Sequence, residues 1–337
     1  MTMPPPTPDA NGFVEIHRGE GTPEVSILMP LCDRALHVSA AIRSVLAQRG
    51  VIAEVIVSDD ASTDASFEVA LQTVRQWLAR HGTQHRILVR RGQQRLRRDH
   101  LALLVDGAGC DLVCQAHDDD LSHPDRARRM VAIFQAHPRI TMATCDAIRI
   151  DGEGKHLPPR TETRQSVPLA TYPIERVLTG DPDLLGFAFA WRRSAVACFE
   201  RLDSRLAAME HDLILAFRAA LAGRVVRHAA QLIARREHAD AWSRTMFFEP
   251  QHDGGSFGWS LSRVSALSVK AADLERAREV GLVTAQEHDR VAALLRQEQA
   301  RYLDRMLQAM RELTRAGKEI AWVERETIAR LKRGERL

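Results

Sequence analysis

An acidic and hydroxyl-rich run lies where an apolar segment of the chain ends. Residues 58–64 read S-D-D-A-S-T-D and come directly after the apolar residues 55–57. Carboxylates at such a position can accept hydrogen bonds from the N–H groups of a base or from ribose hydroxyls, which makes Asp59 and Asp60 candidates for binding a nucleoside. Ser, Thr and Asp are also the residues preferred in turns and helix caps, so a purely structural turn is the alternative.

Three consecutive carboxylates follow a second apolar segment. Asp118, Asp119 and Asp120 come after residues 112–115 and before Pro124. Close packing of three carboxylates is electrostatically unfavourable unless a cation or solvent relieves it. Mg²⁺ and Mn²⁺ prefer oxygen ligands and are often held by one or two carboxylates together with the phosphates of a substrate. The run therefore indicates a divalent metal site that also holds a diphosphate, with a solvated acidic loop as the alternative.

The segments that must position these carboxylates alternate between strand and helix patterns. Short apolar runs predict buried strands at 25–31, 55–57, 87–89 and 112–115. Apolar residues at helical spacing predict helices at 38–46, 67–78 and 100–105. This alternation favours a parallel sheet with right-handed crossovers. In such sheets ligands bind beyond the carboxyl ends of the strands, where both acidic runs are expected to lie.

The rest of the chain divides into a mixed region and a helical tail. The mixed region has expected helices beginning at 124 and covering 213–222, expected strands within 140–150, 184–191 and 225–233, and an expected polar loop at 151–165. Beyond residue 257 there is no strand pattern. Thr284 and Glu287 form a capping-box pattern, an apolar stripe continues to Gly317, and a further helix is expected at 322–331. We predict a disordered lead-in at 1–22, an α/β domain at 23–256 and a helical extension at 257–337.

Composition excludes several other classes of protein. The chain of 337 residues has 45% hydrophobic residues, 27% charged residues and a net charge of +3, as in an ordinary soluble globular protein, and its charge does not indicate a nucleic-acid partner. No apolar run approaches the roughly 20 residues of a membrane span, and the proline-rich first eight residues do not resemble a secretory signal. The five cysteines are odd in number and lack a C-x-x-C pair, so we expect no disulfide framework and a reducing cytoplasm.

Six sequence elements together resemble one enzyme family. In chain order they are V-S-I-L-M-P at 25–30, A-I-R-S-V-L-A-Q at 41–48, S-D-D-A-S-T-D at 58–64, H-D-D-D at 117–120, His211-Asp212 followed by Arg218 and Gly223, and Arg236-x-His238 near Ser243. This series is similar to that of the family 2 glycosyltransferases. The resemblance covers about residues 25–243. It implies an α/β fold of the GT-A type, a Rossmann-like nucleotide-diphospho-sugar transferase with a mainly parallel sheet flanked by helices, here with a C-terminal α-helical extension.

The resemblance also implies a reaction and assigns residues to it. It implies an inverting, metal-dependent transfer of a sugar from a nucleotide-diphospho-sugar, with a UDP-sugar expected, to a hydroxyl acceptor in bacterial surface polysaccharide or glycan assembly. Asp212 is the implied catalytic base. The implied donor-binding residues are Pro30, Asp33, Asp59, Asp60, Asp118 and Arg236. The implied ligands of a Mn²⁺ or Mg²⁺ ion are Asp119, Asp120 and His238, with a diphosphate contact as the alternative for His238.

The chain departs from the family pattern at several places. His117 occupies the first acidic position under one register of the metal motif, whereas the other register pairs Asp118 with Asp119, and both stay open. Glu210 competes with Asp212 for the role of base, and Asp212 also suits a helix N-terminus. The Arg98-Asp99-His100 region lacks a clean Arg-Asn element. These departures keep a second hypothesis open, a nucleotide-sugar-binding relative that acts as a scaffold. A nucleotidyltransferase ranks lower, because no glycine-rich loop with a lysine follows the first strand.

The partners and location follow from the same hypothesis. We expect a nucleotide-sugar donor, a glycan or lipid-linked acceptor, and a cytoplasmic protein. The apolar stripe of the tail must be buried, either within the chain, in a homodimer or against the inner membrane. The basic residues that would suit an anionic membrane are Arg325, Arg330, Lys332, Arg333 and Arg336. Because Glu324, Glu326 and Glu335 dilute this charge, packing within the chain or dimerisation is favoured over peripheral membrane contact.

Overall fold

The computed structural model describes residues 7–96, 99–159, 168–180, 184, 186–201, 211–238 and 255–315. The chain forms two compact units. The first, here the sheet unit, comprises Met1–Tyr172, Pro182–Ala197 and Gly223–Glu237, and the second, here the helical unit, comprises Pro173–Asp181, Cys198–Ala222 and His238–Leu337.

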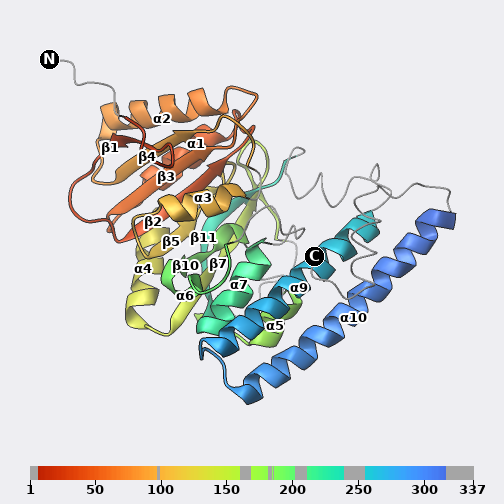
Figure 1. Cartoon of the computed structure of the whole chain (residues 1–337). Helices are drawn as coiled ribbons and strands as arrows, with labels where there is room; N and C mark the ends of the chain where they lie inside the picture. Colours follow the sequence, from red (N-terminus) through yellow and green to blue (C-terminus); the bar gives the residue numbers. More distant parts are fainter. Residues whose placement is uncertain are drawn as a thin grey trace. The chain divides into compact units, whose positions relative to one another are not determined.

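A mixed, largely parallel sheet forms the centre of the sheet unit (Figure 1). Its main path runs in the order β1-β4-β3-β2-β5-β10-β7-β11-β6, while β8 pairs with β7 and β9 pairs with β11. The strands are β1 (Val14–His17), β2 (Val25–Leu31), β3 (Ala53–Asp59), β4 (Arg86–Arg91), β5 (Leu112–Gln115), β6 (Leu121–Ser122), β7 (Ile140–Ile150), β8 (His156–Leu157), β9 (Leu169–Tyr172), β10 (Ala190–Arg192) and β11 (Arg224–Arg236). The neighbouring strands β4, β3, β2 and β5 are parallel, as the alternating sequence pattern predicts.

Helices cover both faces of this sheet. The helices of the sheet unit are α1 (Val38–Leu46), α2 (Ser66–His81), α3 (Asp99–Gly107), α4 (Arg126–Ala136) and α6 (Arg193–Val196), with a 3₁₀ turn at Gly186–Ala188. Alternate residues of β2, beginning with Val25 and Ile27, join one core with the apolar faces of α1, α2 and α4. The intervening residues point to the other face, where α3 packs against β2. Each predicted strand and helix up to residue 136 is present.

A buried polar network supports the amino-terminal ends of these strands. Glu54 is 1% exposed and accepts hydrogen bonds from Ser26 Oγ at 2.6 Å, Arg86 Nη1 at 2.8 Å and the Gly109 amide at 2.7 Å. Arg86 also pairs with Glu15 of β1 at 2.6 Å. A buried carboxylate is tolerated when it is paired and hydrogen-bonded in this way. The network therefore serves structure at the end of the sheet opposite the acidic runs.

Three local predictions in the sheet unit need correction. Residues 14–17 were expected in the disordered lead-in, but they form β1, because β4 offers free backbone groups and Phe13 finds a buried position against Gly107. The apolar run 184–191 was expected to be one strand. Within its described residues it forms the 3₁₀ turn and the short strand β10 instead, because the apolar pattern cannot distinguish these alternatives. The expected loop at 151–165 contains β8, and residues 160–165 lie outside the described ranges.

The helical unit contains α5 (Ile174–Thr179), α7 (His211–Ala222), α9 (Gly255–Glu279) and α10 (Ala285–Arg315). α9 and α10 pack along each other and are joined by a short connection at 280–284. The predicted capping box is present, since the Glu287 carboxylate accepts from the Thr284 amide at 2.9 Å and the Glu287 amide donates to Thr284 Oγ1 at 3.2 Å. None of the described helices is both long and apolar enough to cross a membrane.

The apolar stripe predicted in the tail is buried inside the helical unit over its described part. Val291, Leu295, Met306 and Ala309 of α10 are all at most 6% exposed. The unit also buries an ion pair between Arg218 of α7 and Asp273 of α9. The expected helix at 322–331 and the basic residues near it lie outside the described ranges.

Candidate functional site

The ends of four parallel strands place the two acidic runs next to each other. In the strand register Leu31 of β2 pairs with Asp59 of β3, Asp59 pairs with Arg91 of β4, and Leu28 of β2 pairs with Gln115 of β5. The chain proceeds from β2 to β3 and β4 on one side and then returns to β5 on the other side of β2. Ligands of open parallel sheets bind at such a reversal of strand order, beyond the carboxyl ends. The structure thus joins the two acidic runs that the sequence places far apart.

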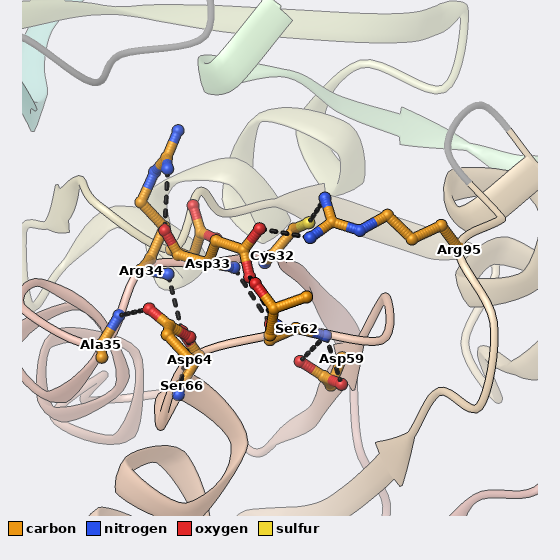
Figure 2. Close-up of polar contacts among 11 residues, drawn as sticks. Cys32, Asp33, Arg34, Ala35, Asp59, Ser62, Asp64, Ser66 and Arg95 are labelled. Atoms are coloured by element: carbon orange, nitrogen blue, oxygen red, sulfur yellow. Dashed lines mark hydrogen bonds and ion pairs between the residues drawn. The ribbon is translucent and has the colours of Figure 1, made fainter.

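The loops after β2 and β3 are tied together by reciprocal hydrogen bonds (Figure 2). The Asp33 amide donates to Ser62 Oγ at 3.0 Å, and Asp33 Oδ1 accepts from the Thr63 amide at 2.7 Å. Asp64 accepts from the Ala35 amide at 3.1 Å and so adds a second tie between the loops. Asp33 and Ala61 both have left-handed backbone, with φ of 51° and 56°. Ala61 stands where the family pattern has glycine, so the chain accepts strain there to keep this loop shape.

Asp59 and Asp60 are buried at the end of β3, at 2% and 4% exposed. Asp59 accepts from the Ser62 amide at 3.2 and 3.3 Å, which agrees with the turn interpretation of this run. Asp60 Oδ1 accepts from the Leu96 amide at 2.6 Å and so fixes the loop after β4. Each carboxylate has further lone pairs for a ligand. The nucleoside-binding role predicted for these two residues therefore stays a prediction.

Arg95 is a site residue that the sequence analysis did not identify. Its guanidinium reaches from the loop after β4 to form an ion pair with Asp33, and its Nη1 lies 2.9 Å from Cys32 Sγ (Figure 2). Burial alone would raise the pKa of Asp33, but the hydrogen bonds from Arg95 and the Thr63 amide outweigh it and hold the pKa below its ordinary value. Burial raises the pKa of the Cys32 thiol to about 11, although Arg95 opposes the rise. The thiol is therefore protonated and not a nucleophile.

The region after β4 that lacks a clean Arg-Asn element is described only in part. Arg98 lies outside the described ranges, whereas Asp99 and His100 begin α3. His100 is buried, and its Nε2 lies 2.8 Å from Ser58 Oγ at the end of β3. Burial lowers the pKa of His100. The neutral ring thus joins α3 to the sheet beside the candidate nucleoside-binding carboxylates.

The acidic loop after β5 is held by the backbone around it. Asp118 accepts from the Cys32 amide at 2.9 Å, which links the ends of β5 and β2 at the reversal of strand order. Asp119 lies 3.6 Å from Arg34 Nε. Burial, and then the Asp119 charge, raises the pKa of Asp118 to about 8 and that of Asp120 to about 7. Burial is the larger cause of the raised pKa values, and crowding by the Asp119 charge adds the repulsion expected from the sequence.

Arg236 fixes this acidic loop from the end of β11. Its amide donates to Asp120 Oδ1 at 2.8 Å, and its Nε donates to the Asp119 carbonyl at 2.9 Å. Its Nη1 donates to the carbonyls of Asp151 and Gly152 at 3.1 and 2.8 Å. Two of the three guanidinium nitrogens are therefore occupied by backbone. The donor-binding role predicted for Arg236 stays a prediction, and its observed role is to position the acidic loop.

Three side chains of this loop fit a divalent cation. One ligand atom each from His117, Asp119 and Asp120 can be chosen so that all lie within 4.8 Å of one another. Two carboxylates and an imidazole are ligands that Mn²⁺ accepts. Asp119 and Asp120 are thus brought together as the sequence predicts. His238, the third predicted ligand, lies in the helical unit, and its role stays a prediction.

Pro30 and Asp212 are the remaining predicted site residues, and they belong to different units. Pro30 lies near the end of β2 and pairs with Ser58 of β3, beside Asp59. Asp212 lies in the first turn of α7 in the helical unit, and its Oδ1 accepts from the Leu213 amide at 3.0 Å. A carboxylate there also suits the positive end of the helix dipole. Glu210, its competitor for the role of base, lies outside the described ranges.

The sequence model of the family described as glycosyl transferase family 2 matches residues 26–199, which include both acidic runs and all four strand ends. The chain belongs to glycosyl transferase family 2. This agrees with the resemblance found in the motifs. The protein EpsE of Bacillus subtilis (strain 168), described as a candidate glycosyltransferase, is 31% identical over 117 residues. That match spans 34% of this chain and 40% of EpsE.

Solved structures confirm the predicted GT-A fold of this family 2 chain. Residues 1–349 of TarS from S. aureus, in complex with UDP-GlcNAc, align with a TM-score of 0.53 at 16% identity, over 88% of this chain and 93% of that chain. The mannosyltransferase PcManGT from Pyrobaculum calidifontis, in complex with GDP-Man and Mn²⁺, aligns with a TM-score of 0.52 at 15% identity, over 93% of this chain and 79% of that chain. At these identities the likeness concerns the fold.

Proposed function

We propose that the protein is an inverting, divalent-metal-dependent glycosyltransferase. In this proposal it moves a sugar from a nucleotide-diphospho-sugar, with UDP-sugars as the first candidates, to a hydroxyl acceptor in bacterial surface polysaccharide or glycan assembly. The observation that carries the proposal is the meeting of Asp59 and Asp60 with Asp118, Asp119 and Asp120 at the reversal of strand order. The nucleotide sugars in the TarS and PcManGT structures support it, because those chains share the fold.

The donor would lie across the ends of β2, β3 and β5. In this arrangement Asp59 and Asp60 accept hydrogen bonds from the nucleoside, and Pro30 and Asp33 at the end of β2 border the donor. Asp119 and Asp120 would hold Mn²⁺ or Mg²⁺, with His238 as the third ligand suggested by the family pattern. The bound cation supplies positive charge that stabilises the leaving nucleoside diphosphate. Arg236 keeps the acidic loop in place through the Asp119 carbonyl and the Asp120 carboxylate.

Asp212 is the proposed general base. It would remove the proton from the acceptor hydroxyl while that oxygen attacks the anomeric carbon on the face opposite the leaving group. Loss of a base that acts only in the transition state lowers turnover without weakening donor binding. Asp212→Asn should therefore lower transfer by at least about 100-fold and change donor affinity little. Asp304→Asn, the same change at an exposed position of α10, is the matched control.

The test combines donor binding with transfer on the full-length chain. Calorimetry with UDP-sugars and Mn²⁺ gives donor affinity, and release of UDP measured with and without acceptor gives turnover. Turnover in the wild type and in Asp304→Asn, with its loss in Asp212→Asn, would support the proposal. Near-normal turnover of Asp212→Asn would show that another group is the base. Tight donor binding without turnover on any donor and acceptor would instead favour a scaffold.

We propose that the helical extension packs within its own chain, in preference to forming a homodimer or a peripheral membrane contact. The supporting observation is the burial of Val291, Leu295 and Met306 inside the helical unit, which leaves little apolar surface on the described part of α10. Light scattering should give the mass of one chain, and flotation with anionic liposomes should leave the protein in the lower fraction. A dimer mass or co-flotation would contradict this proposal.

A further inference from the structure

We propose that His117 is a nitrogen ligand of the catalytic cation, and that the site therefore prefers Mn²⁺ and Co²⁺ over Mg²⁺. This inference rests on the proposed metal-dependent function and refines its metal site. It concerns a position at which the family pattern, in one of the two possible registers, has a carboxylate. The consequence is a change in metal selectivity that belongs to this chain.

The distances in the acidic loop suit three ligands of one ion. His117 Nδ1 lies 3.9 Å from Asp120 Oδ2, and the ligand atoms chosen from His117, Asp119 and Asp120 all lie within 4.8 Å of one another. Ligand atoms at about 2.1 Å from one ion are separated by roughly 3 Å when adjacent and roughly 4.2 Å when opposite. The His117–Asp120 separation thus needs to shorten by roughly 0.9 Å. His117 and Asp119 are partly exposed and can make this adjustment around the buried Asp120. The two aspartates of the cluster are the pair already proposed as ligands.

The surroundings of the His117 ring leave Nδ1 directed toward Asp120. Nε2, the other ring nitrogen, lies 3.2 Å from the side-chain amide of Gln115, and the edge of the Phe187 ring packs at a centroid distance of 6.1 Å. A metal-ligating histidine commonly donates its second N–H to an acceptor, which fixes the ring and its tautomer. The Gln115 amide can supply its oxygen for this purpose by rotation about its last bond. Gln115 is then a positioning residue for His117.

Gln115 is itself well fixed at the end of β5. Its amide donates to the Phe189 carbonyl at 2.9 Å, and its carbonyl accepts from Arg126 Nη2 at 2.7 Å. Arg126 is 2% exposed, so this contact is buried. The backbone that carries both Gln115 and His117 is therefore held from two sides. A ligand mounted on such a segment needs little reorganisation to bind a cation.

The chemistry of the donors sets the expected selectivity. Mg²⁺ favours oxygen ligands and gives up water reluctantly, whereas imidazole is a good ligand for later first-row ions. Replacing a carboxylate by imidazole therefore weakens the binding of Mg²⁺ relative to that of Mn²⁺. The effect is stronger relative to the binding of Co²⁺. His117→Asp should reverse this change and restore oxygen-only donors within the cluster. The ratio of the Mg²⁺ and Mn²⁺ dissociation constants is the quantity that reports it.

The direct test is nitrogen coupling to bound Mn²⁺, measured by electron spin echo envelope modulation on the full-length protein without nucleotide. The wild type should show coupling to an imidazole nitrogen. Because His238 is the other proposed nitrogen ligand, the comparison is made in a His238→Asn background, where His117→Asp should abolish the remaining coupling. In His117→Asp, the ratio of the Mg²⁺ and Mn²⁺ dissociation constants should change in favour of Mg²⁺ by at least about tenfold. In Gln115→Leu, the affinity for Mn²⁺ should fall by about 10- to 100-fold. His156→Asp, the same change at an exposed histidine of β8, should leave both readouts unchanged.

Several outcomes would overturn the inference. Absence of nitrogen coupling in the wild type would do so, and so would coupling that is unchanged in His117→Asp and disappears entirely in His238→Asn alone. If His117→Asp melts well below the wild type, His117→Gln replaces it, with the same loss of nitrogen coupling expected. Mn²⁺-dependent transfer without nitrogen coupling would refute the role of His117 and leave the proposed function intact. If no divalent ion binds or supports transfer, the metal-dependent function itself is wrong.

Discussion

The buried pair between Arg218 and Asp273 allows a stability prediction with a worked magnitude. Arg218 Nε lies 2.7 Å from Asp273 Oδ2, and Nη2 lies 2.9 Å from Oδ1, so the contact is bidentate. The two side chains are only 4% and 5% exposed. Burial raises the pKa of Asp273, while Arg218 opposes the rise. Arg218→Met would leave a buried carboxylate without its main partner, which is costly because water cannot reach it.

Protonation of Asp273 sets an upper limit on the loss of stability in Arg218→Met. Its ordinary pKa is 3.8, so taking up a proton at pH 7 costs about 1.36 kcal/mol for each of roughly three pH units, or about 4 kcal/mol. At pH 5 the same cost is about 1.6 kcal/mol. In the variant, the pKa of Asp273 is higher in the folded state than in the unfolded state. The folded state therefore holds the proton more tightly, and the variant loses stability as pH rises. The Lys270 charge also acts on Asp273, so these are upper figures.

Urea unfolding of the full-length protein at pH 5 and pH 7 measures the effect. Arg218→Met should lose up to about 4 kcal/mol at pH 7 and clearly less at pH 5. The double variant Arg218→Met, Asp273→Asn removes the buried carboxylate, so its loss should be smaller and should depend less on pH. A loss below about 1 kcal/mol at pH 7, or one equal at both pH values, would refute the reasoning.

Three further predictions concern residues near the strand ends and the sheet. Ala61→Gly should stabilise the protein by about 0.5 kcal/mol in thermal unfolding, because relief of the left-handed backbone outweighs the added freedom of glycine in the unfolded chain; a lower melting temperature would contradict this. Gly92→Ala should cost about 1–3 kcal/mol in urea unfolding, because its Cβ would lie 2.4 Å from the Asp59 carbonyl oxygen; an unchanged midpoint would show that the loop adapts. Burial lowers the pKa of His85 below 6.5, so stability should fall as pH drops below that value, and His85→Gln should flatten the decline; parallel stability curves would exclude this role.

The sequence was sufficient for the architecture around the site because its apolar patterns are strong. The β2 run and the helical spacing in 38–46 predict a buried strand and an amphipathic helix, and both are present. Acidic residues directly after strands predict where the carboxylates gather, since the ends of parallel strands share one edge. The capping box at Thr284 and Glu287 is equally local and equally visible.

The contacts that define the site in detail could not be predicted from local patterns. The Arg236 amide binds Asp120 across 116 residues of sequence, and Arg95 binds Asp33 across 62. Such pairs depend on how distant loops meet, which no spacing rule specifies. The direction of the His117 side chain likewise follows from the path of its loop and from Gln115. For this reason the motif predicted Asp119 and Asp120 as metal ligands, whereas it placed His117 at an acidic position in only one of two registers and did not predict it as a ligand.

We propose that the acidic loop after β5 binds a nucleoside diphosphate through a divalent cation. The most direct measurement is calorimetry of UDP and GDP binding to the full-length wild type, with Mn²⁺ and with a chelator, and to Asp119→Asn with Mn²⁺. The preferred nucleotide should bind at least about tenfold more weakly without metal and in Asp119→Asn. Asp304→Asn should match the wild type. Binding of equal strength in all four cases, or no binding of either nucleotide, would contradict the account.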